Sequence, residues 1–202
     1  NGRGHVQSFK IDAETTAALK KISDQCKATL YHTLFAVYEI FLAKCCYTED
    51  IAVLTVTSGR THPFVENMVG MFVHTLPVRL QVTSNKTWLH IIEEMKQQIV
   101  EMIENQDYPL EYMVERLQFP IEKVRAGFTY QSADHELPNT LSAGELTLTP
   151  FEVKNAATRS DVSLLIQETN DGLSCLMECN AAIFSETKLD VLMVQKATDR
   201  AA

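Results

Sequence analysis

Residues 69–80 read VGMFVHTLPVRL, and they form the clearest strand signal in the chain. Apolar residues fill most of the run after the glycine, and we expect a β-strand over residues 71–82. Pro77 has no amide hydrogen for a strand ladder, so we expect a sheet edge or a bulge beside it. On a regular strand His74 shares one face with Phe72, Leu76, Val78, Leu80 and Val82.

His74 is the polar residue of this stretch that invites a functional interpretation. Histidine transfers protons near neutral pH, so a catalytic role is one hypothesis. A buried imidazole without hydrogen-bond partners costs about 1–3 kcal/mol, so a structural role on an apolar face is the other. The spacing favours the structural role, while the bend expected at Pro77 leaves open that His74 lines a cleft.

Predicted strands and helices follow one another along the chain on either side of this stretch. Periodicity predicts strands at 6–11, 51–57, 125–132, 145–149, 161–168 and 173–180, and helices at 13–27, 30–46, 87–105, 109–117 and from Ser185 onward. The continuous apolar run at 51–57 favours a strand covered on both faces. Asp171–Gly172 favours a hairpin with a type I′ turn. The intermixing predicts one α/β domain over residues 1–202, a two-layer sandwich of helices on a mixed β-sheet.

The predicted helices differ in how much apolar surface they carry. The helix at 30–46 is apolar around most of its circumference, which predicts a buried helix. In the helix at 13–27 the inward face is predicted to hold Leu19, Ile22 and Cys26. In the helix at 87–105 the inward face is predicted to hold Trp88, Ile91, Ile92, Met95, Ile99, Met102 and Ile103.

Composition excludes several classes of function. The 202 residues carry a net charge of −8, which argues against binding to nucleic acid or to anionic membranes. No uncharged apolar run is long enough to predict a transmembrane helix. The five cysteines match no zinc spacing and favour reduced thiols in a cytoplasmic protein. Because the chain begins with Asn1 and shows no signal peptide, we expect a piece of a longer polypeptide.

Motifs of nucleotide-binding and hydrolytic sites are absent from the sequence. It contains no GxGxxG, no GxxxxGK[ST] and no GxSxG, and none of the six histidines has metal-ligand spacing. The polar run NQDYPLE (105–111) favours the end of one helix and the start of the next at Pro109. Arg60, after Ser58–Gly59, favours a loop residue that binds a carboxylate or a carbonyl group.

Three segments, in this order, resemble the condensation domains of non-ribosomal peptide synthetases. TEDIAVLTVTSGRTHP (48–63) is similar to the family's xxDIVVGTPVAGR segment. VGMFVHTLPVR (69–79) is similar to (I/V)GMFVNTLPLR, and NQDYPLE (105–111) to (H/N)QDYPFE. The resemblance covers most of the chain and implies the C-terminal half of a domain with a chloramphenicol acetyltransferase-like fold.

The resemblance also implies that the two halves of the domain have different roles. The family's catalytic HHxxxDG motif belongs to the N-terminal half and is absent here, so no catalytic residue is expected and the chain alone should be inactive. This half would supply the acceptor-side tunnel wall, a floor loop near 58–74 and a latch within 135–160. The residues expected to shape the tunnel or the motifs are Asp50, Arg60, Gly70, Phe72, His74, Thr75, Arg79, Gln106, Asp107, Tyr108 and Pro109.

Partners follow from the same resemblance. It implies an N-terminal condensation half, peptidyl and aminoacyl carrier proteins with phosphopantetheine arms, and an adjacent adenylation domain, with no cofactor bound directly. Three departures stand out. His74 replaces the family's Asn, which implies a hydrogen-bonding support, and Leu54 replaces a Gly. The family motif resembling RDxSRNPLF, expected before the strand at 125–132, is absent. Condensation is favoured over epimerisation. A CoA-dependent acyltransferase of the same fold and a non-catalytic partner-recruitment domain remain alternatives.

Overall fold

The structure is a computed structural model that describes residues 2–118, 120–133, 141–144, 146–149, 157–158 and 160–185. The chain divides into two compact units. One comprises Asn1–Ala13 and Tyr130–Ala202, and the other comprises Glu14–Thr129. The single domain expected over residues 1–202 stays a prediction.

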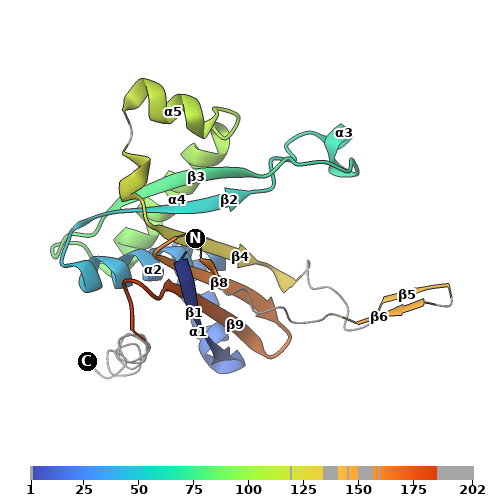
Figure 1. The fold of residues 1–202 in the computed structure, drawn as a ribbon. Helices are drawn as coiled ribbons and strands as arrows, with labels where there is room; N and C mark the ends of the chain where they lie inside the picture. The colour runs from blue at the N-terminus through green and yellow to red at the C-terminus, as the bar shows by residue number, and fades with distance from the viewer. Residues whose placement is uncertain are drawn as a thin grey trace. The chain divides into compact units, whose positions relative to one another are not determined.

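The unit Glu14–Thr129 contains a mixed sheet whose strands run in the order β3-β2-β4 (Figure 1). Strand β2 (Asp50–Thr57) pairs antiparallel with β3 (His74–Gln81) and parallel with the start of β4 (Ala126–Gln131). Within the described residues β3 pairs with β2 alone, so it lies at an edge as Pro77 predicts. The mixed sheet predicted from the sequence is confirmed.

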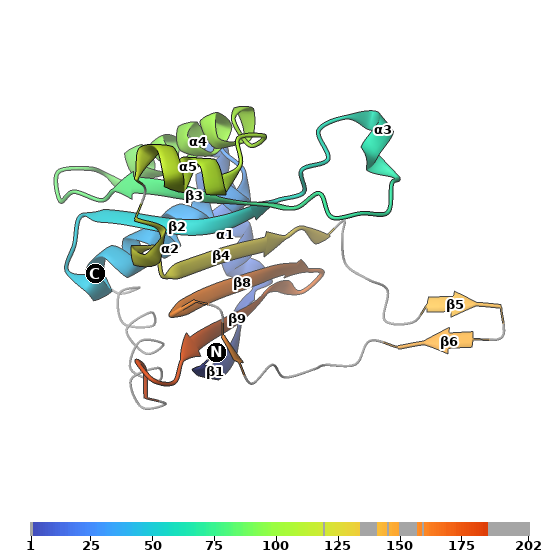
Figure 2. The ribbon, with the colours of Figure 1, turned by 45° about the horizontal axis from the view of Figure 1, so that its top comes forward.

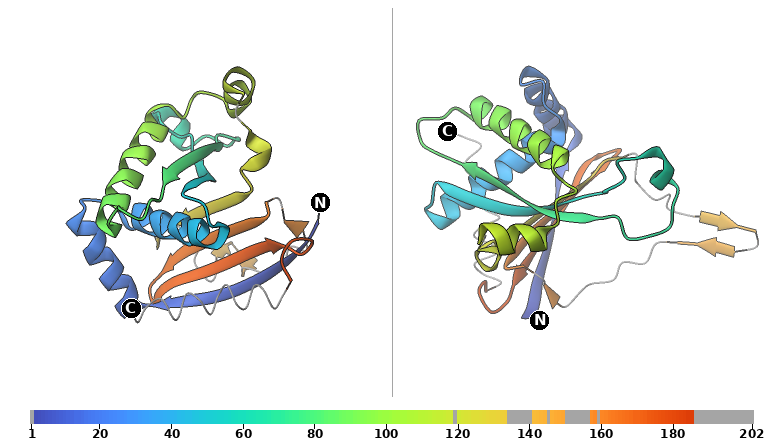
Figure 3. Two further views of the ribbon diagram at one scale, coloured as in Figure 1. Left: turned by 90° about the vertical axis from the view of Figure 1, so that its left-hand side faces the viewer. Right: turned by 90° about the horizontal axis from the view of Figure 1, so that it is seen from above.

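Two of the helices of this unit, α2 (Leu30–Cys46) and α4 (Trp88–Glu104), cover one face of the sheet. The others are α1 (Ala13–Gln25, which begins at the unit boundary), α3 (Pro63–Glu66) and α5 (Leu110–Leu117), with a 3-10 turn η1 (Ile121–Lys123). Helices α2 and α4 pack on each other, α2 contacts β2 and α4 contacts β3. Both lie on the same side of β2 and β3 (Figure 3).

Helix α2 is the buried helix that its composition predicts, with the predicted boundaries. Its N-terminus is a capping box, in which the Thr29 hydroxyl accepts from the His32 amide and the His32 ring accepts from the Thr29 amide. Phe35 stacks on Phe128 of β4 with ring centroids 4.5 Å apart. The aromatic contact joins helix and sheet into one core.

Three predictions about covered faces are wrong. Strand β2 buries one face only, and Val56 on the other face is 42% exposed, because α2 and α4 lie on a single side of the sheet. Ile22 is exposed because α1 instead turns Ser23 inward, where its hydroxyl contacts the Thr33 hydroxyl at 2.7 Å. On α4, Trp88 in the first turn and Ile103 in the last turn are both half exposed, so neither lies on the buried face of that helix.

The second unit contains an antiparallel sheet in the order β8-β9-β1-β7 (Figure 2). Its strands are β1 (Gly2–Asp12), β7 (Ala157–Thr158), β8 (Val162–Thr169) and β9 (Gly172–Asn180), and a separate pair comprises β5 (Leu141–Ala143) and β6 (Leu146–Leu148). Leu164 pairs with Met177 and Ile166 with Cys175, and all four are buried.

The hairpin between β8 and β9 is present, but its turn differs from the prediction. Thr169 pairs with Gly172, so Asn170 and Asp171 are the turn residues. A type I′ turn needs positive φ at both central residues, whereas only Gly172 has a positive φ here, of 128°. The predicted helix after Ser185 and most of the predicted latch segment lie outside the described residues.

Candidate functional site

The SGR and GMFVH segments lie apart in the sequence but meet where β2 ends and β3 begins. Thr57 of β2 pairs with His74 of β3, so the residues after β2 lie beside those before β3. Gly59 has a φ of 63°, and a Cβ there would lie 1.7 Å from the Phe72 carbonyl oxygen. Only glycine permits this approach, which fixes the SGR segment against the GMFVH segment.

Arg60 holds the loop that connects β2 to β3. Its guanidinium donates hydrogen bonds to the carbonyl oxygens of Val65 and of Glu66, the latter at 3.3 Å. The same group lies 4.5 Å from the centroid of the Phe72 ring. The interpretation of Arg60 as a loop residue that binds a carbonyl group is therefore confirmed.

His74 lies on the face that its position in the sequence predicts. It is half-buried at the start of β3, on the side of Leu76, Val78 and Leu80. The strand begins at His74 and not at residue 71, so Phe72 precedes it. Among the described residues the imidazole has no hydrogen-bond partner, so the supporting role expected for it is not observed.

Asp50, Thr75 and Arg79 lie on the opposite face of the sheet from His74. Arg79 donates two hydrogen bonds to the Asp50 carboxylate, at 2.7 and 2.6 Å. The hydrogen bond from Arg79 lowers the pKa of Asp50. Asp50 is at the start of β2, and its partner on β3 is Gln81. This ion pair joins the two strands at the end of the pair remote from His74.

The NQDYPLE segment ends one helix and begins the next, as predicted. The Gln106 side chain is buried and donates to the Ile103 carbonyl at 2.9 Å. Asp107 and Tyr108 are exposed, and Pro109 precedes the first residue of α5. In the described part of the chain no hydrogen bond or ion pair joins this segment to the SGR or GMFVH residues.

The loop between β2 and β3 carries exposed apolar side chains that sequence reasoning missed. We call residues 61–73 the apolar loop; it includes α3 and extends beyond the ends of β2 and β3 (Figure 1). Its exposed apolar residues are Phe64, Met68, Val69, Met71 and Val73. Val69 is fully exposed and Met71 is 90% exposed. The sequence did carry a signal for this surface, because the apolar residues here follow neither the period of 2 of a strand nor the period of 3.6 of a helix.

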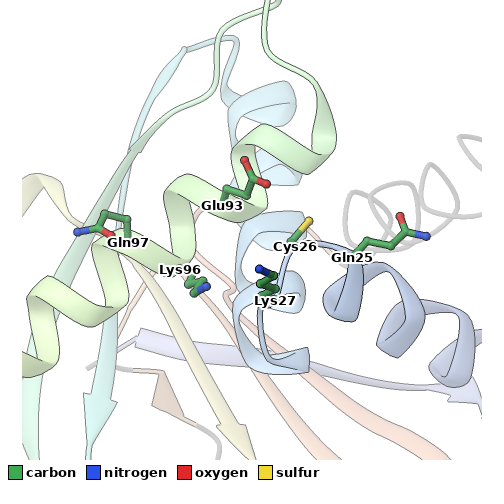
Figure 4. A pocket seen from close by; sticks show the side chains of 6 residues that line it. All are labelled: Gln25, Cys26, Lys27, Glu93, Lys96 and Gln97. Atoms are coloured by element: carbon green, nitrogen blue, oxygen red, sulfur yellow. The ribbon is translucent and has the colours of Figure 1, made fainter.

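A polar hollow of about 350 Å³ lies elsewhere in the same unit, beside α1 and α4 (Figure 4). Its lining residues are Gln25, Cys26, Lys27, Glu93, Lys96 and Gln97. Burial raises the pKa of the Cys26 thiol, and the nearby Glu93 raises it further. A raised pKa disfavours the thiolate, which is the nucleophilic form of a cysteine, and the hollow shares no residue with the motifs. No group of side chains suited to a metal ion is found among the described residues.

The model of the condensation-domain family matches residues 1–196. The chain belongs to the condensation-domain family. Surfactin synthase subunit 1 of Bacillus subtilis (strain 168) is 30% identical over 96% of the chain and 6% of its own length. Tyrocidine synthase 3 of Brevibacillus parabrevis is 36% identical over 83% of the chain and 3% of its own length. The chain thus spans a small part of these relatives.

Solved structures confirm the predicted chloramphenicol acetyltransferase-like fold class of condensation domains. A four-domain non-ribosomal peptide synthetase, holo-AB3403 bound to AMP and glycine, has a TM-score of 0.85 at 18% identity, over 95% of this chain and 16% of that one. The condensation domain of the Monacolin K polyketide synthase MokA has a TM-score of 0.80 at 17% identity, over 96% of this chain and 45% of that one. Within the described residues, the helices are too short or too polar to traverse a lipid bilayer.

Proposed function

We propose that this chain is the C-terminal half of a condensation domain that forms peptide bonds in a non-ribosomal peptide synthetase. The proposal rests on how much of a solved condensation domain this chain accounts for. Nearly the whole chain aligns with the MokA condensation domain, yet it accounts for 45% of that chain. The sequence also lacks the HHxxxDG motif that the family resemblance assigns to the other half.

The proposed reaction joins two substrates that are held as thioesters on the phosphopantetheine arms of carrier proteins. The acceptor amine attacks the donor carbonyl, a C–N bond forms, and the C–S bond breaks. The amine loses one proton, and the released donor thiol gains one. Because thioesters are reactive, holding both arms in one tunnel supplies much of the rate acceleration through position and orientation.

The role proposed for this half is to form the acceptor side of that tunnel. The meeting of Gly59, Arg60, Phe72 and His74 supports this assignment, since the residues that match the family motifs converge at one end of the sheet. Carrier proteins and an adjacent adenylation domain are the partners proposed with it. A cytoplasmic location is proposed because the described cysteines are all free thiols.

The decisive experiment measures product formation with loaded carriers. An aminoacyl and a peptidyl carrier protein are mixed with this chain alone, and separately with the longer protein that includes the preceding half. We expect the elongated peptide, followed by mass spectrometry, with the longer protein only. Peptide formation by the isolated chain would overturn the proposal, as would acyl transfer from free acyl-CoA without any carrier protein.

Partner recruitment without catalysis is the second candidate. The X-domain of teicoplanin biosynthesis has a TM-score of 0.80 to this chain, and a related structure is a complex of the X-domain and OxyB. A fold of this kind therefore also occurs in a complex with another protein. The sequence preceding this chain in its parent protein discriminates: an intact HHxxxDG favours condensation, and a degraded motif favours recruitment.

A further inference from the structure

We propose that the polar hollow beside α1 and α4 binds a small zwitterion, an α-amino acid with a free ammonium group and a free carboxylate. The hollow shares no residue with the motifs that identify the family, so the inference does not depend on the proposed function. It assigns a ligand to a surface that the proposed condensation reaction does not use.

Charged side chains of both signs line the hollow. Lys96 extends from α4 toward α1, and Lys27 lies opposite it at the end of α1 (Figure 4). Glu93 precedes Lys96 by three residues on α4. Residues with this spacing on a helix are close enough to pair, yet among the described residues none of the three side chains forms an ion pair or a hydrogen bond. Two cations and one anion therefore face the hollow without a partner.

The opposite charges act on the same part of the hollow. Burial and Glu93 raise the pKa of the Cys26 thiol, whereas Lys96 lowers it. Burial also lowers the pKa of His32, and Lys96 lowers it further. The charges of Glu93 and Lys96 therefore both reach the inner side of the hollow, where Cys26 is buried.

A zwitterion matches this arrangement of charges. In the proposed complex its carboxylate lies between Lys27 and Lys96, and its ammonium group lies at Glu93. A simple anion would meet the Glu93 carboxylate, and a simple cation would meet the two lysines, so each suits the hollow less well. The side-chain amides of Gln25 and Gln97 offer hydrogen bonds to a polar side chain of the ligand. The volume of about 350 Å³ lies within the range of about 300–1,000 Å³ that is usual for small-molecule pockets.

The walls of the hollow are held by contacts of their own. Lys27 has a φ of 48°, in the left-handed conformation that commonly closes the end of a helix. The Cys26 thiol donates to the Leu89 carbonyl at 3.8 Å, which joins the end of α1 to α4. The Gln97 side-chain amide donates to the Glu101 carboxylate at 2.9 Å. A site whose walls are fixed before binding loses less conformational entropy when the ligand enters.

The test is a titration of the chain with L-glutamine, followed through the amide chemical shifts in NMR spectra. L-glutamine carries both charges and a side-chain amide that suits Gln25 and Gln97. Acetate and inorganic phosphate are titrated in parallel, because they carry negative charge alone. We expect L-glutamine to shift the amide signals of Lys27 and Gln97 with a Kd of about 1 mM, and to bind about tenfold more tightly than either anion.

Two variants separate the charges of the ligand. Lys96→Met should weaken the binding of L-glutamine about tenfold, because the carboxylate loses one of its partners. Glu93→Gln should weaken L-glutamine by a similar factor without weakening acetate, because acetate has no ammonium group. Lys123→Met and Glu104→Gln, at exposed positions in the same unit, are the matched controls and should change no affinity.

Each other result contradicts a stated part of the proposal. The absence of shifts at Lys27 and Gln97 at concentrations far above the expected Kd would overturn the site. Binding of acetate or phosphate as tight as that of L-glutamine would identify a simple anion site and overturn the zwitterion. Unchanged L-glutamine binding in Glu93→Gln would do the same. None of these results bears on peptide formation, so the inference and the proposed function fail separately.

Discussion

Glu39 gives the sharpest prediction about stability. It lies on α2, its side chain is completely buried, and neither carboxylate oxygen has a hydrogen-bond partner among the described residues. Burial therefore raises the pKa of Glu39 well above its ordinary value of 4.5. The folded protein keeps this carboxyl group protonated in a range of pH where the unfolded chain ionises it.

The pH dependence follows from this difference in proton binding. Below about pH 4.5 both states bind the proton, and the full stability is present. As pH rises towards the raised pKa of the folded state, only the unfolded chain releases the proton. The equilibrium constant for unfolding then increases about tenfold per pH unit through this one group. Glu39→Gln cannot ionise, so this contribution to the slope should disappear.

Chemical unfolding followed by circular dichroism tests the prediction at about one-unit steps from about pH 5 to 8. Glu39→Gln should become progressively more stable than the unaltered chain as pH rises. Glu39→Met also removes the buried polar group, which should add about 1–3 kcal/mol at every pH. Glu104→Gln, at an exposed position on α4, should leave the slope unchanged. Equal slopes for the unaltered chain and Glu39→Gln would refute the reasoning.

Three further predictions concern a turn, an ion pair and the apolar loop. Gly172→Ala should lower stability by about 1–3 kcal/mol in thermal unfolding, because φ is 128° and the new Cβ would lie 2.2 Å from the Ile11 carbonyl oxygen. Asp50→Asn should cause a small loss at neutral pH that vanishes as pH falls through the pKa of Asp50, which its hydrogen bond with Arg79 lowers. The isolated chain should self-associate in sedimentation velocity, and Met71→Ser should reduce this, because Met71 is 90% exposed.

Each of these predictions has a control. Gly144 has a φ of 63° with open space around its added Cβ, so Gly144→Ala should cost about 1 kcal/mol and less than Gly172→Ala. A loss in Asp50→Asn that persists at high salt would contradict an exposed ion pair. Val100→Ser, on α4, should leave self-association unchanged, and a chain that stays monomeric at all concentrations would contradict the role of the apolar loop.

The pattern of apolar residues predicted the helices and strands because these form largely from residues that are close in the sequence. Helix α2 has the boundaries that its apolar residues indicate, β2 lies at the continuous apolar run that predicts it, and β3 occupies residues 74–81 of the strand predicted over 71–82. The pattern did not predict which faces are covered. The exposure of Val56 depends on where α2 and α4 pack, and that arrangement is set by tertiary contacts which no window of sequence contains.

The candidate site was likewise predictable in part. That Arg60 binds a carboxylate or a carbonyl group was predictable from its residue type in a loop. The choice of the Val65 and Glu66 carbonyl groups was not, because it requires the folded path of the chain. The family motifs predicted that the residues around Gly59 and those around His74 contribute to one site. The structure adds that they meet through backbone contact at Gly59.

The residues that identify the family are mostly residues that determine shape. In VGMFVHTLPVRL, Leu76, Val78 and Leu80 pack into the core, and Phe72 receives the Arg60 guanidinium. A tunnel that accelerates thioester aminolysis by position needs a wall of fixed shape more than it needs a further acid or base. Motifs made of residues that determine shape therefore suit the role proposed for this chain, a tunnel wall whose chemistry another part of the domain would complete.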